Sequence, residues 1–134
     1  MGIYLNPGSD MFQQSLNSMI FVDKSDIIAE LNKIINTNEK YICISRPRRF
    51  GKSMTMNMVS AYYDRTVESS LFAKTKISKT DNYAKHRGAY DVLFINMQNF
   101  LSKTKTMEDL LRLLEIRVGR ELVYAYPDID FFDK

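Results

Sequence analysis

The sequence predicts an α/β protein in which helices flank a parallel sheet. Residues 41–45 are β-branched or aromatic at most positions and hardly alternate with polar residues, as expected of a strand buried on both faces. Residues 90–97 contain a second continuous apolar run of this kind. Between these two runs the spacing of apolar residues becomes helical: Met54, Met58 and Tyr62 lie four residues apart and mark one face of a helix. The elements therefore follow the order strand, loop, helix and later strand.

Residues 1–40 are predicted to form a helical lead-in. Ser9 follows a turn signal and is placed to cap a short helix. Residues 19–22 form a short apolar run that suits an edge strand. Asp23 or Ser25 is then expected to cap a second helix. The apolar stripe of that helix consists of Ile27, Ile28, Leu31, Ile34 and Ile35.

A basic loop joins the first predicted strand to the helix, and it ends in Gly51, Lys52 and Ser53, the close of a phosphate-binding loop (P-loop) pattern. Gly51 lets the backbone approach a phosphate, and the helix that follows offers unpaired N–H groups and a positive dipole end. We expect Lys52 to reach the β- and γ-phosphates of ATP and the Ser53 hydroxyl to bind Mg²⁺. The usual pattern has a glycine five residues before Gly51, where this chain has Arg46. The alternative to a P-loop is an exposed turn before a helix.

Four neighbours of this triplet complete the predicted nucleotide site. Arg48 and Arg49 are expected to lie along the phosphates or to meet carboxylates elsewhere, since the guanidinium group suits both partners. Phe50 and Met54 flank the triplet and are included as nucleotide-contacting residues. Arg46 is held extended by the proline that follows it, so it is the least expected to touch the ligand.

The segment 65–89 is predicted to be a solvated connector. It is rich in lysine and arginine but lacks the interleaved aromatic residues of a base-stacking surface. Thr80 is expected to cap a short helix that ends at Gly88. His86, the only histidine, has no acidic or serine partner nearby in sequence, so no catalytic role is expected for it.

The second predicted strand ends without the acidic residues of a Walker B strand. That strand would supply an aspartate for magnesium and a glutamate for the attacking water, whereas this chain has Asn96 and Gln98, which we expect to be loop residues. A catalytic carboxylate, if the chain has one, would have to come from Asp23, Asp64 or Asp91. We therefore expect ATP binding without useful hydrolysis, and a sheet cut short before the Walker B strand.

Thr106 is predicted to cap the longest helix, over residues 107–125. Its apolar face consists of Met107, Leu110, Leu111, Leu114, Val118 and Leu122. Residues 1–134 are accordingly interpreted as one incomplete N-terminal P-loop domain. Its parts are the lead-in over 1–40, a strand, P-loop and helix over 41–64, the connector over 65–89, and a strand with the long helix over 90–126.

The composition is that of a globular domain, with 45% hydrophobic and 26% charged residues and a net charge of +3. No apolar run approaches the length of a membrane span and no export signal is visible, so we expect a cytoplasmic protein without a membrane partner. Four positive charges cluster around the basic loop, which favours a local phosphate site over a general nucleic-acid surface. Cys43 is expected to be a buried apolar residue of the first strand.

The sequence Arg46-Pro47-Arg48-Arg49-Phe50-Gly51-Lys52-Ser53 resembles the R-P-R-R-F-G-K-[ST] signature of the predicted AAA-ATPase-like proteins, a bacterial P-loop family that lacks the first glycine. Residues 21–25 resemble its V-D-K-[ST] segment, residues 71–72 its L-F pair, and residues 90–96 the strand that follows. The resemblance implies a segment that binds ATP with Mg²⁺. It also implies that Asp23 and Lys24 lie near the nucleotide. It also implies a downstream nuclease-like domain of the PD-(D/E)XK type, which nothing in these residues matches.

Two alternatives from other functional classes stay open. The first is a basic nucleic-acid-binding module in which Gly-Lys-Ser is incidental, although no recognised nucleic-acid motif is present. The second is an inactive truncated fragment, which the small number of predicted strands favours.

Overall fold

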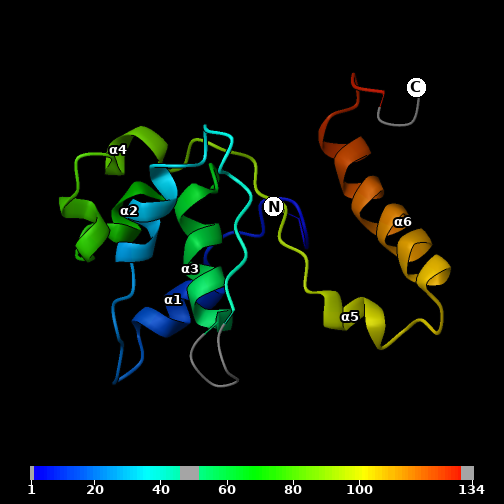
Figure 1. Ribbon diagram of the computed structural model, residues 1–134, viewed down its shortest axis with the longest axis horizontal. Coiled ribbons are helices and arrows are strands. Elements are labelled where there is room, and N and C mark those ends of the chain that lie inside the picture. Colours follow the sequence, from blue (N-terminus) through cyan, green and yellow to red (C-terminus); the bar gives the residue numbers. More distant parts are fainter. Residues whose placement is uncertain (1, 46–51, 131–134) are drawn as a thin grey trace. The chain divides into compact units, whose positions relative to one another are not determined.

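The computed structural model describes residues 2–45 and 52–130, and these divide into two compact units. Residues 8–91 form one unit, which contains helices α1 to α4 (Figure 1). Residues 1–7 and 92–134 form the other, which contains α5 and α6. The two units are referred to below as the α3 unit and the α6 unit.

The predicted parallel sheet is wrong, because the described residues contain neither a β-strand nor a sheet. Residues 41–45 form no strand, and Tyr41 is 86% exposed. Cys43 is likewise exposed, not buried. Residues 90–97 make only isolated bridges, one of them through Leu93, whose side chain is 48% exposed. A strand is stable only where neighbours accept its backbone hydrogen bonds, and an apolar run alone does not supply them.

The α3 unit consists of short helices packed around an apolar core. Its helix bounds are α1 Asp10–Leu16, α2 Asp26–Asn32, α3 Lys52–Tyr63 and α4 Tyr83–His86, with 3-10 helices at Ser69–Phe72 and Lys76–Lys79. The helix predicted from the spacing of Met54, Met58 and Tyr62 is confirmed as α3. Its core contains Phe12, Ile28, Met58, Ala61, Tyr62, Phe72 and Ile77. The rings of Phe12 and Phe72 stack with centroids 4.9 Å apart, so aromatic contacts join α1 to the connector after α3.

Side chains expected to cap helices in this unit bind the connector instead. Ser25 stands at the N-terminus of α2 without capping it, and its Oγ accepts a hydrogen bond from the Ile77 amide at 3.0 Å. The Asp23 carboxylate accepts from the amides of Ser25 at 2.9 Å and Lys76 at 2.8 Å. Residues 19–22, predicted as an edge strand, are not a strand either. Ser9 and Thr80 also make no side-chain cap: α4 begins after Asn82, and the Thr80 hydroxyl donates to the Ile77 carbonyl.

A polar cluster around the buried Asn32 amide joins α2, α3 and the start of α4. Its Oδ1 accepts from the Tyr63 hydroxyl at 2.6 Å, and its Nδ2 donates to Tyr62 Oη at 3.0 Å and to Asn82 Oδ1 at 3.3 Å. The Tyr62 hydroxyl in turn donates to the Tyr83 carbonyl at 2.7 Å. Every member therefore has a partner, which is the condition for polar groups to be tolerated in a core.

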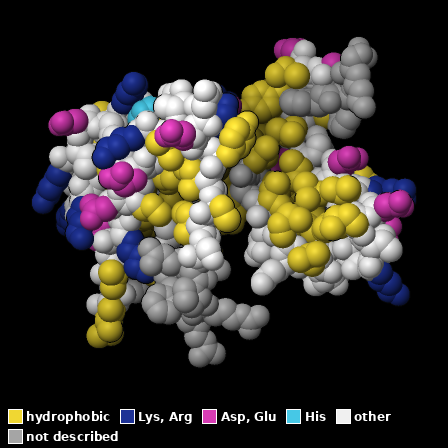
Figure 2. Space-filling model, viewed as in Figure 1, with side chains coloured by type: hydrophobic (Ala, Val, Ile, Leu, Met, Phe, Trp, Pro, Cys, Tyr) yellow, Lys and Arg dark blue, Asp and Glu magenta, His cyan; other side chains and the backbone are white. Residues whose placement is uncertain are grey.

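The α6 unit contains α5, Met97–Leu101, and α6, Met107–Ala125. The predicted cap of α6 is confirmed, because Thr106 Oγ1 accepts from the Asp109 amide at 3.2 Å. The predicted apolar face of α6 is only partly covered: Leu110 and Val118 are buried, whereas Met107 and Leu111 are exposed. Figure 2 shows hydrophobic side chains gathered on this part of the surface. Neither α6 nor another described helix has the length and apolar character needed to cross a membrane.

Replacement of Asn32 by Ala should lower the free energy of unfolding by about 1–3 kcal/mol, because it leaves the partly buried Tyr63 hydroxyl without its acceptor. Ser60 on α3 is the contrasting control, since its buried hydroxyl has no hydrogen-bond partner among the described residues. Ser60→Ala should leave stability unchanged or raise it by about 1 kcal/mol. Urea denaturation of both variants measures this, and equal losses in the two would contradict the polar cluster.

Candidate functional site

The N-terminus of α3 is the feature that the sequence singled out, and the structure places a helix start there. α3 begins at Lys52 and runs for 12 residues, with no acidic side chain in its first turn. The first N–H groups of a helix have no partner within it and lie at the positive end of its dipole. Ser53 and Met54, the next two residues, are exposed. This end of α3 therefore suits an anionic group.

Most of the predicted loop lies outside the described residues. Residues 46–51 are not described, and they include Arg46, Arg48, Arg49, Phe50 and Gly51. Of the predicted site, the structure thus places the backbone of Lys52 and the residues Ser53 and Met54, which follow one another along the first turn of α3.

The opposite end of α3 is held firmly. Met58, Ala61 and Tyr62 lie in the core of the unit. Asp64, directly after the helix, is fully buried, and its carboxylate accepts from the Gly8 amide at 2.9 Å. The helix is therefore fixed at one end by packing and hydrogen bonds, while its first turn stays accessible.

The three aspartates considered as catalytic carboxylates all have structural partners. Asp23 accepts from two backbone amides, as described above. Asp64 accepts from the amide of Thr66 at 2.8 Å and from its hydroxyl at 2.6 Å, in addition to Gly8. Asp91 pairs with Arg65, with 2.7 Å between Oδ1 and Nε. Each of these carboxylates helps to fix the chain that surrounds it.

Other residues discussed from the sequence are also involved in local structure. Asn96 stands at the N-terminus of α5, where its Oδ1 accepts from the Gln98 amide at 3.1 Å. His86 is buried, with its Nδ1 2.8 Å from the Tyr90 hydroxyl and its ring stacked on Tyr90. Burial lowers the pKa of His86 below its ordinary value, with a smaller contribution from Lys85.

Magnesium is the metal that the sequence implied. No cluster of three or more His, Cys, Asp or Glu suited to a metal ion occurs among residues 2–45 and 52–130. A P-loop magnesium ion does not need such a cluster, because one protein hydroxyl, phosphate oxygens and waters complete its shell. The exposed Ser53 at the start of α3 fits this type of donor set.

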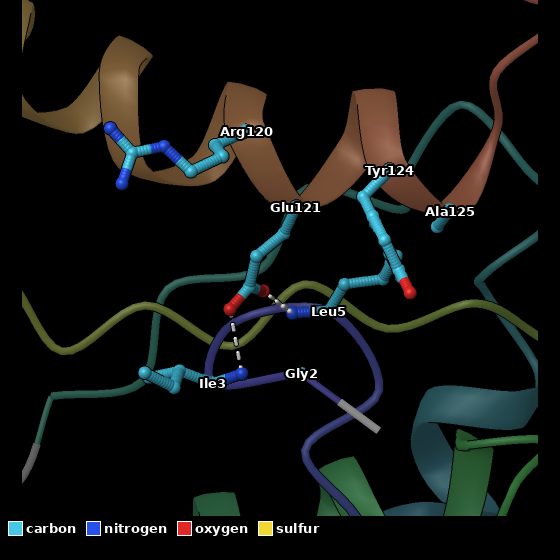
Figure 3. A pocket seen from close by; sticks show the side chains of 7 residues that line it. All are labelled: Gly2, Ile3, Leu5, Arg120, Glu121, Tyr124 and Ala125. Atoms are coloured by element: carbon cyan, nitrogen blue, oxygen red, sulfur yellow. Dashed lines mark hydrogen bonds between the residues drawn. The ribbon is translucent and has the colours of Figure 1, made fainter.

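A second site in the structure had no signal in the sequence. The α6 unit contains a pocket of about 800 Å³ lined by Gly2, Ile3, Leu5, Arg120, Glu121, Tyr124 and Ala125 (Figure 3). Its lining joins residues more than a hundred positions apart in the chain, and the Glu121 carboxylate binds backbone amides of the N-terminal segment. No local spacing pattern encodes such a pairing.

Comparison with known proteins gives one match. A family model described as Predicted AAA-ATPase matches residues 8–126, which include the basic residues 46–49, α3 and the whole of α6. No curated protein and no solved structure matches the chain. The match covers well over half of the sequence and agrees with the resemblance noted in residues 46–53. The chain therefore belongs to the family of predicted AAA-ATPases.

Proposed function

We propose that this chain binds the phosphates of ATP, together with Mg²⁺, at the N-terminus of α3 through Gly51, Lys52 and Ser53. The observation that carries the proposal is the start of a helix at Lys52, directly after the basic glycine-containing loop. In a family of predicted AAA-ATPases, this is the position at which a helix dipole and unpaired amides would meet a phosphate.

Each residue of the triplet has a distinct part in the proposal. Gly51 permits close backbone approach, and Lys52 provides the charge for the β- and γ-phosphates. The Ser53 hydroxyl binds the magnesium ion, which when present neutralises phosphate charge. The proposed contacts are completed by the neighbours of the triplet, Arg48, Arg49, Phe50 and Met54. Of these, the two arginines are the ones whose guanidinium groups can bind phosphates.

The proposal is limited to binding, without useful turnover. Hydrolysis needs a side chain that orients the attacking water, in addition to groups that hold the phosphates. Asp23, Asp64 and Asp91 are engaged in hydrogen bonds or an ion pair that stabilise the α3 unit. Interactions that hold substrate and transition state equally do not raise the rate of the chemical step.

Lys52→Ala should weaken Mg-ATP binding about tenfold to a hundredfold, because a charge-assisted hydrogen bond contributes about 1.5–3 kcal/mol. Isothermal titration calorimetry of the whole chain measures the affinity. Lys79→Ala is the matched control, since it removes one exposed lysine of the same unit far from the loop in sequence, and it should bind as the unchanged chain does.

Equal ATP affinity in Lys52→Ala and in the unchanged chain would overturn the assignment. Duplex DNA provides the competing test, because a nucleic-acid module would bind it with a steep dependence on salt concentration and without nucleotide. We expect no such binding, and its observation would favour the nucleic-acid module.

Phosphate release from the chain incubated with Mg-ATP should stay at the background level of the Lys52→Ala variant. The reason is that the proposed site supplies ground-state contacts and no water-orienting carboxylate. Turnover that depends on Lys52 and approaches about 1 per second, the low end for ordinary enzymes, would show that the chain contains a catalytic carboxylate after all.

A further inference from the structure

Three consecutive backbone amides of the N-terminal segment converge on one carboxylate of α6. The amide of Ile3 donates to Glu121 Oε1 at 2.7 Å, and the amides of Tyr4 and Leu5 donate to Oε2 at 2.9 and 2.8 Å. Figure 3 shows the Glu121 side chain reaching from α6 to this segment. Both carboxylate oxygens are thus bound by main-chain donors, which is the arrangement of a backbone anion receptor.

The turn that carries these amides leaves no room for a side chain at Gly2. The Gly2 amide donates to the Leu5 carbonyl at 2.9 Å and closes the turn. A Cβ atom at Gly2 would lie 2.6 Å from Glu121 Oε2 and 2.9 Å from its Cδ. A side chain at position 2 would therefore displace the Glu121 carboxylate from its place on the three amides.

The bound segment in turn orders the chain that leads into α5. The Tyr4 carbonyl accepts from the Phe94 amide at 2.8 Å. The Asn6 amide donates to the Val92 carbonyl at 2.8 Å, and Asn6 Oδ1 accepts from the Val92 amide at 2.8 Å. One carboxylate thus connects α6, the N-terminal segment and residues 92–94 within the α6 unit.

We propose that residues 2–5 and Glu121 form an anion latch, in which an intramolecular carboxylate occupies a backbone receptor and keeps the N-terminal segment on α6. Loss of the negative charge opens the latch, and a small external carboxylate can occupy the emptied receptor. Opening would also expose the apolar wall of the adjoining pocket at Leu5 and Ala125.

The electrostatics of the site agree with a closed latch at neutral pH. Burial by itself would raise the pKa of Glu121, but the hydrogen bonds from Leu5, Tyr4 and Ile3 outweigh it and hold the pKa below its ordinary value of 4.5. Arg120 and Tyr124 line the same pocket, and Tyr4 lies on the bound segment. Because the folded pKa is depressed, the stabilisation is present above about pH 4.5 and is lost as the pH falls through the folded value.

Hydrogen exchange of the individual amides in the whole chain tests the latch. In Glu121→Ala, the amides of Ile3, Tyr4 and Leu5 should exchange at least about tenfold faster at pH 7, since each lost bond to a charged acceptor is worth about that factor or more. Glu121→Gln keeps one acceptor oxygen but loses the charge, so exchange should speed up by a smaller factor. Glu115→Gln, an exposed glutamate on the same helix, should leave their exchange unchanged. Equal protection of residues 3–5 in Glu121→Gln and in the unchanged chain would overturn the latch.

Two further experiments distinguish a receptor for anions from a segment that only loses packing when Glu121 is removed. Sodium acetate, compared with sodium chloride at equal ionic strength, should restore protection in Glu121→Ala, where removal of the side chain leaves space for it. Gly2→Ala should speed exchange more in the unchanged chain than in Glu121→Ala, because the closest contact of the added Cβ is the carboxylate at 2.6 Å and only the contact with the Leu5 carbonyl at 3.0 Å remains without it. Failure of acetate to restore protection, or an equal effect of Gly2→Ala in both backgrounds, would contradict the proposal.

Discussion

A buried aspartate at the end of α3 is the interaction on which the α3 unit depends. Asp64 is fully buried, so its carboxylate is tolerated only because hydrogen bonds replace the water it has lost. It accepts from Gly8 on one side and from Thr66 on the other. The chain beside it is held as well, since the Arg65 amide donates to the Tyr90 carbonyl at 3.0 Å. Asp64 thereby joins the segment before α1 to the end of α3. The neighbouring Arg65 amide adds the link to Tyr90.

This anchoring decides where the first turn of α3 is presented. α3 packs against α1, and its second half lies in the core with Met58 and Tyr62. The polar cluster around Asn32 also orients these helices, because the bond that Asn32 donates to Tyr62 and the bond that it accepts from Tyr63 have a preferred geometry. The first turn of α3, in which Ser53 and Met54 are exposed, thus belongs to a helix whose other end is packed in the core.

Features encoded by nearby residues could be predicted from the sequence. The helix that contains Met54, Met58 and Tyr62 follows from their spacing, and α6 follows from its apolar spacing together with the Thr106 cap. The sheet could not be predicted in this way, because strand pairing depends on distant partners that an apolar run does not reveal. Residues 41–45 and Leu93 carry the composition of buried strands and yet are exposed.

The same division applies to the sites. The phosphate-binding pattern is contiguous, so the triplet at residues 51–53 was visible at once. Asp64 and Asp23 were considered for catalysis, whereas their oxygens bind amides of segments far away in the sequence. The sequence gives no signal for Glu121, because its partners at residues 3–5 are separated from it by 116 to 118 positions. Such pairings need the three-dimensional structure.

Assigned amide spectra of the isotopically labelled chain, titrated with Mg-ATP, test the central claim most directly. The account predicts that the largest chemical-shift changes fall on the amides of Ser53 and Met54 in the first turn of α3, and that Mg-AMP causes much smaller ones, since it lacks the β- and γ-phosphates. Changes confined to the lysine-rich connector 65–89 or to the α6 unit, with the first turn of α3 unaffected, would contradict a phosphate site at this helix.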